Sequence, residues 1–207
     1  MIIPTAFIVG GSIFSDSKGE IDLQNNIRNG LGKGISTRLD DYFRYGPMAE
    51  LAIANAIGLK SKNHWFDQAK NLFLIDVASF ITVRSLKSLT KRSRPNNKYI
   101  LNSFPSGHTT LAFSNATMLY YEYREDHPVF AYSGYAFATA TGALRVLNDR
   151  HWVGDVLVGA GIGMLITHLV YKLEPLKNWN PFLKKERLSF RPIVNRDELM
   201  IGIHWRF

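Results

Sequence analysis

The 207-residue sequence contains no cysteine. This absence excludes a disulfide-stapled fold, a zinc site with thiolate ligands and catalysis by a cysteine nucleophile. A chain without cysteine can fold in a reducing or an oxidising compartment, so the cysteine count does not indicate where this protein resides.

Long hydrophobic runs are also scarce. A membrane-spanning helix needs about 20 mostly apolar residues, and three stretches approach that length: 103–121 starts with polar residues, 128–144 is rich in Ser, Thr, Tyr and Gly, and 156–171 is short and contains His168. The mean hydropathy is −0.09. We therefore interpret these stretches as buried helices of a soluble or peripheral protein.

The first fifteen residues carry no charge but lack the basic leader and small-residue cleavage site of a secretory signal. They predict a buried first helix. With 46% hydrophobic residues, the chain can bury one continuous core, and no repeat or low-complexity segment divides it. We expect a single domain over residues 1–207.

Acidic residues are fewer than basic ones, 17 against 25, which gives a net charge of +8. Such a balance favours an anionic partner: a phosphate ester, a nucleic acid or an acidic lipid surface. Charge alone does not choose among these three.

Apolar residues recur at helical spacing, so the core is predicted to be all-α, a compact helical bundle. The expected helices cover 48–59, 65–89, 111–121, 129–146 and 153–173, and Pro128 is suited to a first helical turn. The tail, residues 175–207, differs: apolar and other residues alternate from Leu199 to Phe207, as in a strand. Residues 187–194 are expected to pair with this strand across 195–198, as a hairpin packed on the helices or on a partner.

Lys87 begins the first chemically suggestive cluster, followed after six residues by Arg94 and Pro95. Lys87 lies near a predicted helix end, and Pro95 favours an extended Arg94, so both cations can meet one anion. Taken alone, the segment is more typical of a solvated basic turn.

Pro105, Ser106, Gly107 and His108 form the second cluster, a turn that opens an apolar helix. Helix N-termini offer unpaired backbone donors, the Ser106 hydroxyl adds another, and Gly107 allows close backbone approach to an oxygen. The alternative is an ordinary capped turn.

The third cluster is Arg145, then His151 after five residues, then Asp155 after three. On a helix beginning near His151, the histidine and Asp155 share a face, so the carboxylate can hold one imidazole N–H and leave the other nitrogen free. Arg145 can supply a bidentate fork to phosphate oxygens. The alternative is a helix cap or surface pair.

Together the three clusters resemble, in order and spacing over residues 87–155, the motifs of the type 2 phosphatidic acid phosphatase superfamily. That superfamily includes bacterial nonspecific acid phosphatases and vanadium-dependent haloperoxidases. One departure is visible, because the serine that usually precedes the third-motif arginine is Leu144 here. We expect altered packing or a lost hydroxyl at that position.

The resemblance implies a phosphatase that needs no metal or other cofactor. Lys87, Arg94, Arg145, the Ser106 hydroxyl and the Gly107 backbone would bind phosphoryl oxygens. His151 would attack phosphorus to form a phosphohistidine, His108 would protonate the leaving group, and Asp155 would hold the His151 tautomer. The remaining histidines are assigned no catalysis, whereas Phe104 and Trp152 flank the motifs and are candidates for the site wall.

A phosphorylated lipid is the leading substrate class, with a peripheral membrane contact, and a soluble acid phosphatase of broad specificity is the alternative. Haloperoxidase activity, a non-catalytic phosphate or headgroup binder, and a nucleic-acid module rank lower; no nucleic-acid-binding motif is present. The resemblance suggests the bacterial cell envelope, periplasmic or membrane-associated.

Overall fold

The computed structural model describes residues 1–30, 37–174, 188–195 and 198–205, and the side chains of residues 1–30 and 37–174. The chain divides into two compact units, Met1–Pro175 and Leu176–Phe207, which are described separately. The expectation of one domain over residues 1–207 stays a prediction.

The first unit is built from helices, which confirms the all-α prediction. The helices are α1 (Ile2–Phe14), α2 (Lys18–Gly30), α3 (Leu39–Phe43), α4 (Gly46–Ala56), α5 (Trp65–Thr90), α6 (Gly107–Tyr123), α7 (Pro128–Leu147) and α8 (Val153–Leu173). The predicted bounds of α8 are matched at both ends, and Pro128 opens α7 as expected. Helices α2 and α3 were not predicted.

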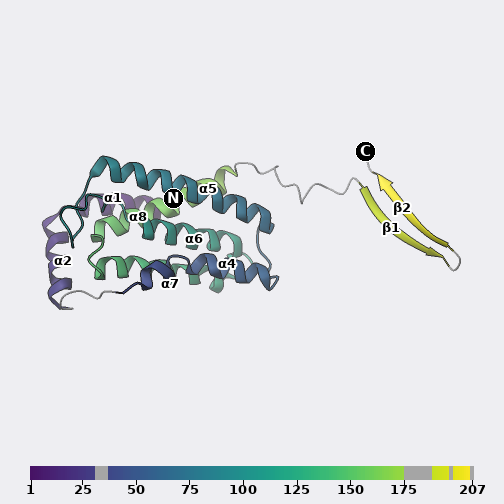
Figure 1. The fold of residues 1–207 in the computed structure, drawn as a ribbon, viewed down its shortest axis with the longest axis horizontal. Coiled ribbons are helices and arrows are strands. Elements are labelled where there is room, and N and C mark those ends of the chain that lie inside the picture. Colours follow the sequence, from purple (N-terminus) through teal and green to yellow (C-terminus); the bar gives the residue numbers. More distant parts are fainter. Residues whose placement is uncertain (31–36, 175–187, 196–197, 206–207) are drawn as a thin grey trace. The chain divides into compact units, whose positions relative to one another are not determined.

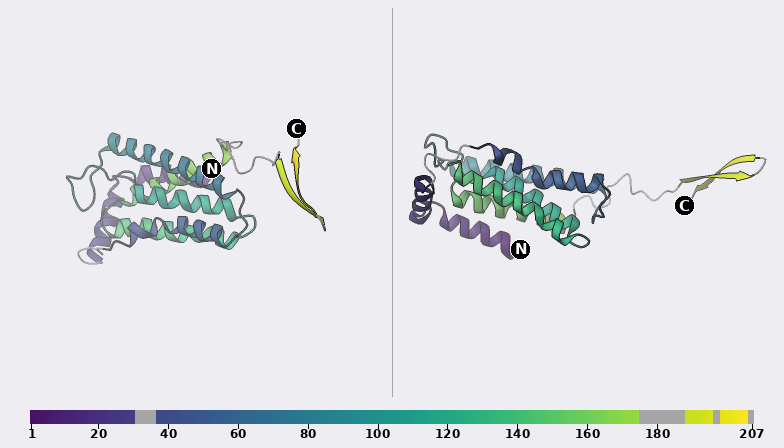
Figure 2. Two further views of the ribbon diagram at one scale, coloured as in Figure 1. Left: turned by 45° about the vertical axis from the view of Figure 1, so that its right-hand side comes forward. Right: turned by 90° about the horizontal axis from the view of Figure 1, so that it is seen from below.

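Helix α6 is the centre of the bundle and packs against α4, α5, α7 and α8, while α1 packs on α8 (Figures 1 and 2). Its buried side chains include Met118, Leu119 and Tyr123, which join Ile75 of α5 and Ala131 of α7 in the core. Helix α2 runs across one end of the bundle (Figure 1). That end holds the site described below.

Glycines let α8 lie unusually close to α6. A Cβ atom at Gly163 would lie 2.4 Å from the carbonyl oxygen of Thr110, and one at Gly159 would lie 2.6 Å from that of Ser106. Real Cβ atoms essentially never approach so closely. The glycines of α8 therefore fix the distance between α8, which carries Asp155, and α6, which carries Gly107 and His108.

We expect Gly163→Ala to lower the free energy of unfolding by about 1–3 kcal/mol, because the added methyl must push α6 away. Gly10→Ala is the matched control, since nothing lies within 4 Å of a Cβ at that position of α1. Equilibrium unfolding of both variants checks the prediction. Equal stability of the two would contradict the close packing of α6 and α8.

Helix α1 corrects one expectation. The helix forms, but it is not buried: only Gly11 is buried along it, while Ile2, Val9 and Ile13 are exposed. The reason is that a single small-residue face meets α8, where a Cβ at Gly11 would lie 2.9 Å from Leu157.

Within the described residues, α8 is the one helix long and apolar enough to cross a membrane, judged by length and composition. Its most apolar window is 56% buried inside the bundle. Buried core helices of soluble proteins meet the same criteria.

The second unit contains the predicted hairpin. Strands β1 (Leu188–Asn195) and β2 (Glu198–Trp205) pair antiparallel, with Leu188 opposite Trp205 and Asn195 opposite Glu198. The outer residues assigned to the hairpin, 187, 206 and 207, and the turn residues 196 and 197 lie outside the described residues.

Candidate active site

The three motifs meet at one end of the bundle. Lys87 lies in the last turn of α5, the Ser106 turn opens α6, Arg145 lies in the last turn of α7, and Asp155 lies in the first turn of α8. Helix α2 braces this end: Gln24 donates from Nε2 to the carbonyl oxygen of Val146, over 3.1 Å. Segments separated by almost seventy residues thereby face one region.

His151 is fully buried and its Nδ1 lies 3.5 Å from Oδ2 of Asp155. The predicted pair is present, but its local geometry differs from the prediction. His151 precedes α8 instead of lying on it, and Asp155 reaches back over the helix start, accepting a hydrogen bond from the Trp152 backbone N–H at 2.9 Å. Asp155 thus caps the helix and faces the imidazole at once.

Burial lowers the pKa of His151 to about 4; Asp155 opposes this shift, and the positive charges of Arg145 and Lys87 add to it. The imidazole is therefore neutral at pH 7, the state in which a ring nitrogen has a lone pair for attack. Since Nδ1 faces Asp155, Nε2 is the nitrogen available to a substrate.

Arg92 is a partner of Asp155 that the sequence does not indicate, because it lies within the basic segment between Lys87 and Pro95, which is typical of a solvated turn. Its Nη1 lies 2.6 Å from Oδ1 of Asp155, and its Nη2 is paired with the buried Glu20 of α2. Ser103 donates to Oδ2 of Asp155 at 2.5 Å. Burial alone would raise the pKa of Asp155, but His151, Arg92 and Ser103 hold it below its usual range.

Arg145 is buried, and its Nη1 donates to Oδ2 of Asp40 over 2.5 Å. The other oxygen of Asp40 accepts from Asn148 at 3.0 Å. The Nε of Arg145 is buried without a hydrogen-bond partner among the described residues. A buried guanidinium N–H without a partner is costly, and here it is a donor available to an anion. With Leu144 before it, Arg145 lies in the last turn of α7. The altered packing or lost hydroxyl expected at Leu144 stays a prediction.

Lys87 and Arg94 are partly buried cations. The ammonium group of Lys87 contacts the backbone carbonyl oxygens of Asn102 and Ser103, the latter at 3.2 Å. Burial first, and then the charge of Arg94, lower the pKa of Lys87 to about 8. Arg94 donates from Nε to Oδ1 of Asn102 over 2.8 Å. Asn102 therefore links both cations. The two side chains are held in place, unlike those of a solvated basic turn.

Ser106 is the N-cap of α6: its Oγ accepts from the backbone N–H of Thr109 at 3.5 Å and lies 2.8 Å from the Thr109 hydroxyl. The alternative reading of a capped turn is thus correct in geometry, and its contact with phosphate stays a prediction. A Cβ at Gly107 would meet only Val83, at 3.5 Å. Space therefore remains beside the start of α6.

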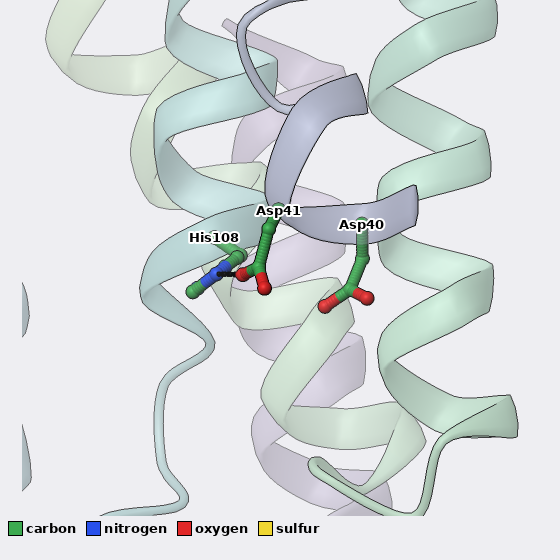
Figure 3. A group of neighbouring side chains, drawn as sticks. All are labelled: Asp40, Asp41 and His108. Atoms are coloured by element: carbon green, nitrogen blue, oxygen red, sulfur yellow. Dashed lines mark hydrogen bonds and ion pairs between the residues drawn. The ribbon is translucent and has the colours of Figure 1, made fainter. Parts of the chain in front are cut away.

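His108 follows Gly107 on α6 and points toward α3, where its Nε2 lies 2.8 Å from Oδ1 of Asp41 (Figure 3). Arg44, which ends α3, has its Nη1 3.0 Å from the same nitrogen. Burial, followed by the charge of Arg145, lowers the pKa of His108 to about 4, while Asp41 raises it. Helix α3 had no signal in the sequence, because five residues are too few for a periodic pattern.

Among the described side chains, the other histidines make contacts elsewhere. His64 caps α5, His127 precedes α7, and Nδ1 of His168 contacts the Tyr121 hydroxyl at 2.5 Å; the side chain of His204 lies outside the described ones. Trp152 donates to the Ser93 carbonyl oxygen at 2.9 Å, so it holds the motif loops together. Phe104 is partly buried, and its role as a site wall stays a prediction.

Comparison with known proteins agrees with this arrangement. A lipid A 1-phosphatase of Porphyromonas gingivalis is 44% identical over 85 residues, which are 41% of this chain and 19% of that protein. The matched part therefore spans about a fifth of that curated relative.

Two solved structures share the fold. The crystal structure of Aquifex aeolicus LpxE aligns with a TM-score of 0.56 and 25% identity, over 77% of this chain and 98% of that one. A transmembrane PAP2 type phosphatidylglycerolphosphate phosphatase from Bacillus subtilis aligns with a TM-score of 0.63 over 88% of this chain and 100% of that one. At 18% identity, the second shows the fold alone.

The sequence profile of the PAP2 superfamily matches residues 68–179, more than half of the chain. That range contains all three motifs, and their side chains converge at one end of the bundle. The chain is a member of the PAP2 superfamily.

Proposed function

We propose that this chain is a phosphoric monoester hydrolase that acts on lipid phosphates through a phosphohistidine intermediate and without a metal ion. The observation that carries the proposal is the buried, neutral His151 held at Asp155, beside an arginine whose Nε has no partner among the described residues. A nucleophile, its orienting carboxylate and a donor for phosphoryl oxygens occupy one site.

In the first step, Nε2 of His151 attacks phosphorus in line and forms the N–P bond as the ester P–O bond breaks. His108 gives its proton to the departing oxygen. In the second step, His108 takes a proton from water, whose oxygen bonds to phosphorus as the N–P bond breaks. The enzyme returns to its first state, and inorganic phosphate leaves.

Charge on the phosphoryl oxygens is neutralised by Lys87, Arg94 and Arg145, with the Ser106 hydroxyl and the backbone at Gly107 as further donors. Donors fixed in advance stabilise the transition state because they do not reorganise during reaction. Each such donor contributes on the order of 100-fold in rate. The buried cations also offset the cost of desolvating a phosphate dianion.

The lipid substrate is supported by the named activity of the Porphyromonas gingivalis relative and by the outer surface of the bundle. Large apolar side chains face outward on several helices: Ile13, Ile53, Phe73, Phe80 and Val129 are each at least 60% exposed. Exposed apolar side chains of this size suit contact with a membrane. We place the enzyme at a membrane of the bacterial cell envelope.

Phosphate release by the purified protein in excess EDTA tests this function. We expect turnover of a short-chain phosphatidic acid and of a lipid A bearing a 1-phosphate, with a lower kcat/KM for a soluble aryl phosphate. A preference for the aryl phosphate would instead identify a broad-specificity phosphatase and remove the lipid substrate. Activity that EDTA abolishes and a divalent cation restores would contradict the metal-free mechanism.

A further inference from the structure

Two residues outside the motifs meet the proposed acid–base histidine. Asp41 lies on α3 and Arg44 ends it, and both reach Nε2 of His108 from the side opposite α6, Asp41 at 2.8 Å and Arg44 at 3.0 Å (Figure 3 shows Asp41). The two contacts join segments more than sixty residues apart. Their chemistry depends on where the imidazole proton lies.

Asp40, Asp41 and His108 are close enough to suggest a cation site, with one ligand atom of each within 4.8 Å of the others. The charges oppose that interpretation. Asp40 is already paired with Arg145, Asp41 with His108, and Arg44 lies beside the same imidazole. A divalent ion would have to displace these pairs and approach two guanidinium groups, so the cluster is an ion-pair network.

Asp41 and Arg44 require opposite states of Nε2. A carboxylate oxygen only accepts, so the Asp41 contact needs a hydrogen on Nε2. A guanidinium N–H only donates, so the Arg44 contact needs a lone pair there. Among the described residues, no hydrogen bond reaches Nδ1 of His108. With Nε2–H held by Asp41, Nδ1 is therefore the nitrogen that can exchange a proton with substrate.

We propose that Asp41 and Arg44 are positioning residues that set the tautomer and the acid strength of His108. Asp41 favours Nε2–H and the imidazolium, and Arg44 disfavours both. This inference rests on the proposed function, in which His108 exchanges the proton of the leaving group.

The charged groups that face His108 shift its pKa in the directions that the proposal requires. Burial lowers its pKa most, Arg145 of α7 and Arg44 lower it further, and Asp41 is the group that raises it. A bound phosphate dianion adds negative charge beside the imidazole and raises the pKa in the substrate complex. Asp41 therefore acts in the same direction as substrate.

An NMR titration of ring-labelled histidine in the full-length protein tests the pairing without reference to activity. The His108 signal is assigned by its loss in His108→Gln. We expect Arg44→Gln to raise the titration midpoint by roughly half a pH unit or more. Asp41→Asn should lower the midpoint, so that the His108 imidazole is neutral at the pH where half of the wild-type protein is protonated. At pH 7, the nitrogen shifts should show Nε2–H in wild type and a loss of that tautomer in Asp41→Ala.

Asp126→Asn is the control, because this exposed residue pairs with Lys60 and lies outside the site. Its His108 titration should match wild type. The side chain of Asp41 is 49% exposed, so its substitution should leave the fold intact. Midpoints that coincide in wild type, Asp41→Asn and Arg44→Gln would overturn the inference.

The activity arm separates this inference from the proposed function. In the pH profile of kcat for a poor alkyl leaving group, the alkaline limb should move to lower pH in Asp41→Asn and to higher pH in Arg44→Gln. An aryl phosphate, which needs less protonation, should respond less. Shifted NMR midpoints in a protein that hydrolyses nothing would refute the function and retain the pair. Normal turnover with unchanged NMR midpoints and unchanged pH limbs in both variants would retain the function and refute the roles of Asp41 and Arg44.

Discussion

Replacing His151 with alanine should reduce phosphate release by a factor on the order of 10⁴ or more, because the variant lacks the atom that bonds to phosphorus. The wild-type imidazole is fully buried and its Nδ1 lies 3.5 Å from Oδ2 of Asp155. Initial rates with the preferred substrate check this expectation. Rapid acid-free quenching with radiolabelled substrate should trap phosphate on the wild-type protein and none on the variant.

His127→Ala is the matched control, since this histidine precedes α7 and makes no capping hydrogen bond with its side chain. It should retain normal turnover. His151→Gln fills most of the volume of the imidazole, so it tests whether activity is lost only because alanine leaves a cavity. Circular dichroism establishes that each variant folds. Turnover by a folded His151→Ala protein at the wild-type rate would refute the assigned nucleophile.

Replacing Arg92 with methionine should lower the free energy of unfolding by about 3–5 kcal/mol, the usual cost of leaving a buried charge without its partner. Arg92 is paired with Glu20 and Asp155, and both carboxylates are fully buried. Burial alone would lower the pKa of Arg92, but Asp155 and Glu20 raise it above its usual value. Activity should fall as well, because Asp155 loses the partner that holds it against His151.

Denaturant unfolding of Arg92→Met, Glu20→Gln and the double variant measures this coupling. The double variant should recover part of the lost stability, since it removes one uncompensated carboxylate. Lys60→Met removes an exposed pair with Asp126 and should have little effect on stability, because water screens the pair. If Arg92→Met costs no more than Lys60→Met, the buried network does not stabilise this end of the bundle.

Residue identity and spacing were enough to predict the all-α class and six of the eight helices of the first unit. With the family resemblance they also gave eight candidate site residues, whose roles stay predictions. Long segments with apolar residues at helical spacing predict helices, because that spacing places the apolar side chains on the face that packs into the core. The order of the motif residues along the chain is what the resemblance to the PAP2 superfamily supplied, and their residue types suit phosphate binding. The alternation of apolar and other residues at 199–207 predicted the hairpin, because side chains alternate between the two faces of a strand.

Local sequence could not predict which polar groups pair across the bundle. Arg92 is a charged residue of the kind usually found at the surface. Helix α2 packs beside it, however, and it is buried with Glu20 and Asp155. Asp40 and Asp41 belong to α3, a helix too short to recognise, and Arg44 follows it. These residues meet Arg145 and His108 only after folding.

The sequence by itself determined the fold class, the family resemblance and the list of reactive groups. The tertiary structure decided their protonation and orientation: it buried His151 and made it neutral, turned Asp155 back over the start of α8, and gave His108 two opposing partners. Burial and long-range ion pairs set these properties, and both depend on distances between segments that no local pattern encodes.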